Sequence, residues 1–307
     1  MKVVITGGTG FVGTGLVRKL HELGNQITIL TRNPEKAKRL FPESIYPGVS
    51  VTAYKIGELT PLKTSLEGAD AVINLAGEPI SERWTTEYKE AILKSREGVT
   101  ADLVAAISQL ENKPETMISG SAIGYYGTSE TATFDENSPA GEDFLAKVCQ
   151  TWEMSAQKVR ESGVRLVILR IGIVLGNGGA LAKMIPPFKI YAGGPIGSGR
   201  QWFSWISRED LIDLIIYCVG HPEVSGTYNA TAPNPVRMKE LCQILGDVLG
   251  RPSWLPVPDF ALELLLGEGA KVVLEGQQVL PSATLNTGFT YKYPTLKPAL
   301  ENIIDKM

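Results

Sequence analysis

The stretch VVITGGTGFVGTGLVRKL, residues 3–20, decides the fold. A β-branched run is followed by Gly7, Gly10 and Gly13, and then by a segment with helical spacing of apolar residues. In such a strand–turn–helix unit the first glycine makes a tight turn, the second lets the backbone approach a pyrophosphate, and the third permits close helix–strand packing. The free N–H groups at the helix start then face the anion. The stretch therefore predicts a dinucleotide-binding turn rather than a glycine-rich turn that binds nothing.

Five further runs share the character of the first strand. β-branched residues bounded by turn residues recur at 26–31, 50–55, 71–76, 116–120 and 165–171, and amphipathic segments lie between them. Apolar strands that alternate with helices indicate a parallel sheet covered on both faces. The predicted fold class is α/β, a Rossmann-type doubly wound parallel sheet with a smaller C-terminal substrate lobe.

The amino-acid composition of the chain changes near residue 175, where glycine and proline become more frequent. We therefore predict a Rossmann domain over 1–175 and a smaller lobe over 176–307. Segments near 206–231 are expected to return to the first domain, and the proline-rich segment 251–260 is a candidate connector.

Composition excludes several classes of function. The 307 residues carry a net charge of −3 with mixed signs, so neither a nucleic acid nor a membrane is the expected partner. Three cysteines without a CxxC pair and two histidines predict neither a disulfide framework nor a metal site. A strand that begins at the second residue leaves no room for a targeting segment, which favours a cytoplasmic location.

The end of the second strand bears on the choice of cofactor. An NAD site usually has an acidic residue there, whereas an NADP site offers cations to the 2′-phosphate. Residues 29–39 read ILTRNPEKAKR, so Arg32 takes the place of the acid and three more cations follow. This pattern favours NADP(H) over the alternative that Arg32 is a solvated loop charge.

The strings TGGTGFVG (6–13), NLAG (74–77) and Ser119-Gly120-Ser121 together resemble the short-chain dehydrogenase/reductase superfamily, extended type. The whole chain resembles its atypical, epimerase-like branch, also labelled cell-division-inhibitor-like, through strings such as SAIGYYG and FLAKVCQTWE. The tail, residues 250–302, resembles the short C-terminal domain of unassigned function that marks this branch.

The resemblance implies NADP(H) across the C-terminal edge of the sheet. It assigns Thr9, Gly10, Phe11 and Val12 to the pyrophosphate, Thr31 and Arg32 to the 2′-phosphate, and Leu75, Ala76 and Gly77 to the adenosine ribose. It also brings Arg96 near the cofactor and Glu78, Arg83 and Trp84 to the site entrance. Without the resemblance, Arg96 would be interpreted as a helix-surface charge.

The usual chemistry of the superfamily needs a serine, a tyrosine, and a lysine four residues after the tyrosine. Ser121 and Lys147 fit, but Asp143 stands in the tyrosine's place. A carboxylate is a poor proton donor at neutral pH, so we expect Asp143 to form an i, i+4 ion pair with Lys147. Tyr125 and Tyr126 are the candidates to replace the phenol, the alternative being that one of them packs in the core.

The segment GSGRQWFSWISREDL, residues 197–211, supplies a candidate substrate pocket. The arginine at 200 suits capture of an anionic group and Trp202 suits stacking, while Trp205 is either pocket or core. The predicted substrate contacts are Glu78, Arg200 and Trp202.

Three functions fit this sequence. The first is an NADP(H)-dependent epimerase or oxidoreductase with a non-standard proton donor, acting on an unidentified small carbonyl or sugar-like substrate. The second is a non-catalytic NADP(H)-binding regulator linked to cell or plastid division, and the third is an adaptor that has lost the ligand. The resemblance also allows a homodimer.

Overall fold

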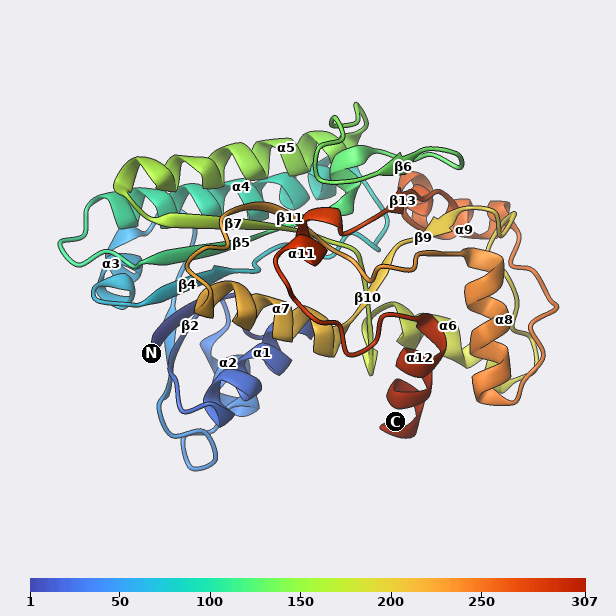
Figure 1. The fold of residues 1–307 in the computed structure, drawn as a ribbon, viewed down its shortest axis with the longest axis horizontal. Coiled ribbons are helices and arrows are strands. Elements are labelled where there is room, and N and C mark those ends of the chain that lie inside the picture. Colours follow the sequence, from blue (N-terminus) through green and yellow to red (C-terminus); the bar gives the residue numbers. More distant parts are fainter.

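The computed structural model describes all 307 residues and centres on one seven-stranded parallel sheet (Figure 1). The sheet runs in the order β11-β7-β5-β4-β1-β2-β3, so the chain reverses its direction of winding between β1 and β4. Its strands are β1 (Lys2–Thr6), β2 (Gln26–Thr31), β3 (Val49–Ala53), β4 (Ala71–Asn74), β5 (Thr116–Ala122), β7 (Arg165–Ile171) and β11 (Gly226–Ala230). The predicted doubly wound α/β fold is confirmed.

Helices cover both faces of this sheet, as Figure 1 shows. One layer contains α1 (Phe11–Glu22), α2 (Pro34–Leu40) and α7 (Arg208–Gly220), and the other contains α3 (Leu59–Leu66), α4 (Thr86–Ser108) and α5 (Phe144–Gln157). Val3 and Ile5 of β1 belong to the core beneath the first layer, and Val4 belongs to the core beneath the second. This alternation is the two-residue period of a strand buried on both faces.

The observed strands differ from the predicted ones at their ends. The strands at 2–6, 26–31 and 165–171 are confirmed, and that at 50–55 is shifted to 49–53. The fourth strand ends at Asn74 rather than residue 76, because the last hydrogen bond to β1 is donated by the Leu75 N–H to the Thr6 carbonyl (3.2 Å). The fifth continues to Ala122, where it is still paired with Ile171.

A second lobe lies beyond the C-terminal edge of the sheet. It contains β8 (Ile173–Gly176), α6 (Gly179–Lys189), β9 (Trp202–Phe203), β10 (Trp205–Ser207), β12 (Val236–Arg237), α8 (Met238–Leu249), α9 (Asp259–Leu266), α10 (Lys271–Leu274) and α12 (Leu296–Asp305). Trp205 is fully buried in its core and donates its indole N–H to the Asn234 carbonyl (3.1 Å). Of the two interpretations of Trp205, the core one is therefore right.

The C-terminal segment returns from this lobe to the main sheet. Strand β13 (Gln278–Val279) pairs with β6 (Thr133–Phe134), and α11 (Ser282–Asn286) lies against β11. Gln277 donates to the carbonyl of Ile123, in the 3₁₀ turn that follows β5 (2.9 Å). Residues from the end of the chain therefore form part of the wall beside the end of β5, and the division at residue 175 stays a prediction.

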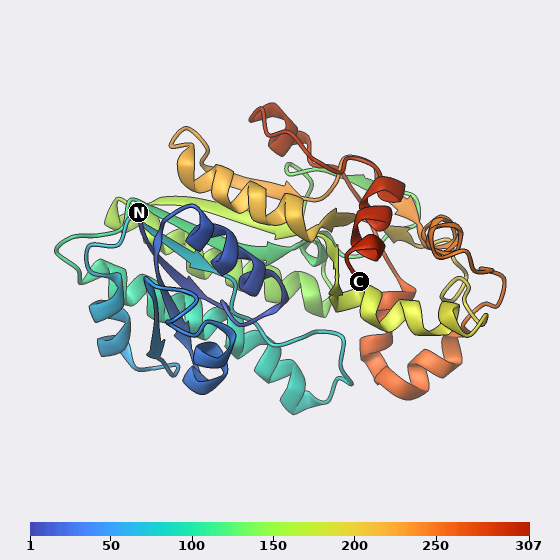
Figure 2. The ribbon, with the colours of Figure 1, turned by 90° about the horizontal axis from the view of Figure 1, so that it is seen from below.

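Viewed from below, α1 and α7 lie in front of the sheet and α9 lies at its far end (Figure 2). No helix combines the length and the apolar character that a membrane span requires.

The turn between β1 and α1 closes only because glycines occupy it. Gly7 has a φ of 74°, and a Cβ there would lie 2.5 Å from the Leu75 carbonyl oxygen. A Cβ on Gly13 would lie 2.2 Å from the Gly7 carbonyl oxygen. The helix start is thus held against the turn more closely than any side chain allows.

We predict that Gly13→Ala destabilises the protein by about 1–3 kcal/mol, because the added methyl forces the turn and helix apart. Urea denaturation followed by circular dichroism measures the loss. Gly220→Ala is the matched control, since a Cβ there meets no atom within 4 Å. Equal stability of the two variants would contradict this account of the turn.

Candidate functional site

The candidate site begins at the N-terminus of α1. Gly10 caps this helix without a side chain, and no acidic residue lies in its first turn. The first backbone N–H groups of the helix are therefore free to bind an anion. A Cβ on Gly10 would meet only the Gly7 carbonyl oxygen, at 3.2 Å, so the glycine leaves the other side of the turn open. This opening fits the pyrophosphate of a dinucleotide.

Phe11 was predicted to contact the pyrophosphate, but its side chain packs within the protein. Its ring packs against glycines of the 176–179 turn and lies 4.9 Å from the guanidinium of Arg208. Arg208 also donates to Thr14 Oγ1 (2.7 Å), which places a cation against the first turn of α1. Only the backbone N–H of Phe11 is available to a phosphate. Sequence reasoning missed Arg208.

The adenosine end of the site lies where β2 and β4 end. Arg32 Nη1 lies 2.7 Å from Glu78 Oε1, and the Arg32 side chain is 68% exposed. Thr31 Oγ1 accepts from the backbone N–H of Asn33 (3.1 Å). Glu78, predicted to contact substrate, therefore lies beside the predicted 2′-phosphate residue and not beside Arg200 or Trp202.

The side chain of Arg96 holds the loop after β4 against α4. It donates to the backbone carbonyls of Ile92 and Glu78 (both 3.0 Å), and a Cβ on Gly77 would lie 2.9 Å from its guanidinium carbon. Its guanidinium also lies 5.3 Å from the ring centroid of Trp152. Burial lowers the pKa of Arg96. The interpretation of Arg96 as a helix-surface charge is wrong.

A buried polar network joins the end of β5 to α5 and β7. Ser121 donates to Glu153 Oε1 (2.6 Å), and Arg170 binds both carboxylate oxygens of Glu153, at 2.8 and 2.9 Å. Arg170 also donates to the Tyr126 hydroxyl (3.0 Å), which in turn donates to Asn229 Oδ1 (2.7 Å). All five residues are at least 95% buried. The hydroxyl of Ser121 is thus bound by a protein carboxylate.

The two tyrosines after β5 have different environments. Tyr126 lies inside the network, and burial, partly offset by Arg170, raises its pKa to about 12. Its prediction as a substrate-facing proton donor is corrected by this burial. Tyr125 is only half buried, its ring lies 3.3 Å below the Arg170 guanidinium, and its hydroxyl makes no hydrogen bond within the protein. Tyr125 is the phenol that remains available.

Lys147 does not face the site. The inward positions of α5 are Cys149, Trp152, Glu153 and Ala156, and Lys147 lies on the exposed side of this helix. Asp143 is the N-cap of the helix and accepts from the Ala146 N–H (2.8 Å), and it forms no ion pair with Lys147. Both expectations for this pair are therefore corrected.

An apolar side chain and a thiol lie where the usual phenol and ammonium were expected. A Cβ on Gly124 would lie 3.3 Å from Leu145 Cβ and 4.0 Å from Cys149 Sγ. Leu145 and Cys149 are the i, i+4 pair that faces the end of β5. Burial raises the pKa of Cys149 to about 11, so the thiol is neutral near pH 7.

The predicted substrate residues of the second lobe form a separate surface cluster. Arg200 is 74% exposed and pairs with Glu130 (3.4 Å), whose carbonyl accepts from the Trp202 indole N–H (3.1 Å). The guanidinium of Arg237 lies 3.7 Å from the Trp202 ring centroid. No hydrogen bond, ion pair or ring contact joins this cluster to Ser121 or Tyr125.

The entrance residues connect the two lobes. Arg83 donates to the carbonyl of Leu264 at the end of α9 (3.3 Å), and the Trp84 ring meets Phe144 of α5 edge-on at 5.2 Å. Lys89 of α4 pairs with Glu268 just beyond α9. The loop after β4 and helix α9 thus meet across the edge of the site.

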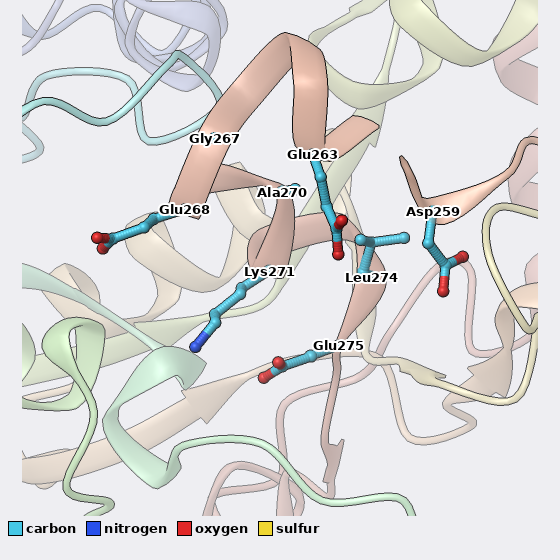
Figure 3. A pocket seen from close by; sticks show the side chains of 8 residues that line it. All are labelled: Asp259, Glu263, Gly267, Glu268, Ala270, Lys271, Leu274 and Glu275. Atoms are coloured by element: carbon cyan, nitrogen blue, oxygen red, sulfur yellow. The ribbon is translucent and has the colours of Figure 1, made fainter. Parts of the chain in front are cut away.

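A hollow of about 480 Å³ lies beside α9 and α10 (Figure 3). Four carboxylates line it, and Lys271 is its single cation; the acidic residues are Asp259, Glu263, Glu268 and Glu275. This charge repels an anionic dinucleotide, so the hollow is distinct from the cradle at α1.

The fold and the cradle define a dinucleotide-binding protein of the short-chain dehydrogenase/reductase type. The chain belongs to the NAD dependent epimerase/dehydratase family, whose model matches residues 3–231. A second model, a domain of unknown function (DUF1731), matches residues 257–303, which confirms the expectation for the tail.

Relatives match the chain over nearly its whole length. The chloroplastic epimerase family protein SDR39U1 homolog of Arabidopsis thaliana is 52% identical over 99% of this chain and 87% of its own. Epimerase family protein YfhF of Bacillus subtilis is 40% identical over 99% and 98%. The crystal structure of human epimerase family protein SDR39U1 with NADPH superposes with a TM-score of 0.89 at 35% identity, covering 100% of both chains.

We predict that Glu153→Gln costs about 3 kcal/mol of stability, because it leaves the Arg170 charge buried without a counter-charge. Guanidinium denaturation measures the cost. Glu161→Gln, at an exposed position, serves as the control. The double variant Glu153→Leu/Arg170→Met should be more stable than Glu153→Gln, and a double variant less stable than the single one would contradict the assignment.

We also predict that Lys147→Ala leaves the dissociation constant of NADPH unchanged within about twofold, since the ammonium is exposed on the far side of α5. Fluorescence titration of NADPH against wild type and variant tests this. A tenfold loss of affinity would show that the lysine reaches the cofactor after all.

Proposed function

We propose that this chain is an NADP(H)-binding epimerase- or oxidoreductase-like protein that acts on a small carbonyl or sugar-like substrate. The observation that carries the proposal is the open, uncapped N-terminus of α1 with Arg32 at the end of the neighbouring strand. The cradle accounts for the pyrophosphate, and a guanidinium accounts for the 2′-phosphate that distinguishes NADPH from NADH. The NADPH in the human relative's structure supports the same choice.

The chain's own residues divide the remaining work. When bound, NADP(H) would supply or accept a hydride. Tyr125 is proposed to give or take the proton at the substrate oxygen, because its hydroxyl is the one phenol beside the end of β5 that no protein group binds. The guanidinium of Arg170 lies 3.3 Å from the centroid of its ring, and this contact orients the phenol. Ser121, held by Glu153, is assigned a positioning role and not direct proton transfer.

One observation favours a second candidate function. The positions that face the end of β5 from α5 hold Leu145 and Cys149, so no ammonium lies beside the Tyr125 phenol on that side. A non-catalytic NADP(H)-binding regulator would need the cradle and not the acid. Under this alternative the contact of Arg83 with α9 would transmit cofactor binding to the second lobe.

For the cofactor, we predict that Arg32→Ala weakens NADPH binding at least tenfold, about 1.4 kcal/mol, through loss of the 2′-phosphate contact. Isothermal titration calorimetry measures the change. Arg39→Ala, an exposed arginine on the adjacent helix α2, is the matched control. Equal affinity of the Arg32 and Arg39 variants would remove Arg32 from the site.

For the chemistry, we predict that Tyr125→Phe abolishes NADPH-dependent reduction of carbonyl compounds while leaving the free energy of unfolding within about 0.5 kcal/mol. Tyr126→Phe should instead lose about 1–3 kcal/mol of stability, because it leaves buried Arg170 and Asn229 groups without a partner. A carbonyl screen with both variants separates the roles. NADPH binding without turnover of any compound would favour the regulator.

A further inference from the structure

Glu78 holds a position that conflicts with a simple NADP site. Its carboxylate lies 2.7 Å from Arg32 Nη1, where a 2′-phosphate oxygen would have to bind. The contact is specific, because the backbone of Glu78 is fixed at both ends: its N–H donates to Ser95 Oγ and its carbonyl accepts from Arg96 Nη2, each at 3.0 Å. The side chain alone is left to move.

Carboxylates offset part of the positive charge in this corner. Near Arg32, Lys38 pairs with Glu35 (3.4 Å), and Glu78 is the carboxylate paired with Arg32 itself. A carboxylate at the adenosine ribose accepts hydrogen bonds from ribose hydroxyls, which is the usual device of an NAD site. In this chain it comes from the loop after β4 instead of the end of β2.

We propose that Glu78 sets the cofactor preference by competing with the 2′-phosphate of NADPH for Arg32. When NADPH binds, the phosphate takes the guanidinium and Glu78 moves aside. When NADH binds, the Arg32–Glu78 pair stays intact and the carboxylate accepts a hydrogen bond from the ribose. The inference rests on the proposed function and adds that the site admits both cofactors, with a modest preference for NADPH.

Because Arg32 and Glu78 are exposed to solvent, replacing their ion pair by a contact between Arg32 and the 2′-phosphate costs little free energy. Arg32 is 68% exposed and Glu78 24% exposed, so water screens their attraction. An ion pair of this kind changes an equilibrium constant by about fivefold at most. The phosphate, with more charge than a carboxylate, can displace Glu78, but Glu78 lowers the advantage of NADPH over NADH.

The test is calorimetric titration of NADPH and of NADH into the full-length wild type, Glu78→Gln and Glu82→Gln. Glu82 is an exposed carboxylate of the same loop without an ion-pair partner, and so is the control for net charge. In Glu78→Gln we expect NADPH to bind about three- to fivefold more tightly and NADH about threefold more weakly, a change of about tenfold in selectivity. Glu82→Gln should leave the ratio of the two dissociation constants unchanged.

The outcomes separate the inference from the proposed function. NADPH binding by wild type, with the same selectivity in Glu78→Gln as in Glu82→Gln, would overturn the inference and leave the function standing. Binding of neither nucleotide by wild type would overturn both. A gain of selectivity in Glu78→Gln alone would establish Glu78 as the selecting residue.

Discussion

The bidentate pair between Arg170 and Glu153 is the interaction on which the rest of the site depends. It joins β7 to α5 in the interior, and each partner then holds a further group: Glu153 binds the hydroxyl of Ser121, and Arg170 binds Tyr126. Two charges this deeply buried are tolerated because each satisfies the other and the remaining hydrogen-bonding groups. Through Tyr126 the network continues to Asn229 of β11.

This network also couples the C-terminal segment to the site. Asn229 donates to the carbonyl of Leu280 and its own carbonyl accepts from Thr284, so the chain after β13 is bound to the same edge of the sheet. Glu136 adds contacts to the N–H groups of Asn229 and Ala283, both at 3.0 Å. The segment matched by the domain of unknown function is thus part of the wall of the site and not a separate appendage.

The sequence predicts the sheet and the cradle well because both follow from local patterns. The β-branched runs and the glycines at 7, 10 and 13 need no knowledge of distant residues. The face of α5 could not be predicted in the same way, since a four-residue spacing fits Asp143 and Lys147 as well as Leu145 and Cys149. Packing against β5 decides between the pairs, and the short polar side chain of Asp143 then caps the helix.

Other site residues could not be predicted from the sequence because their partners are distant in the chain. Arg208 reaches Thr14 across 194 residues, and Glu153 meets Arg170 from a different element, so neither role has a local signal. Conversely, Arg200 and Trp202 have the composition of a ligand pocket, but they bind Glu130 at the surface. The cytoplasmic location, the homodimer and the link to division stay predictions, and one relative is a chloroplastic protein.

The central claim is that a dinucleotide lies across the α1 cradle, with its adenosine end between β2 and β4. Hydrogen–deuterium exchange by mass spectrometry, with and without NADPH, tests it most directly. The account predicts slower exchange in peptides covering residues 7–14, 31–33 and 75–78, and no change in the acidic hollow at 259–275. Protection confined to the hollow, or none at residues 7–14, would contradict it.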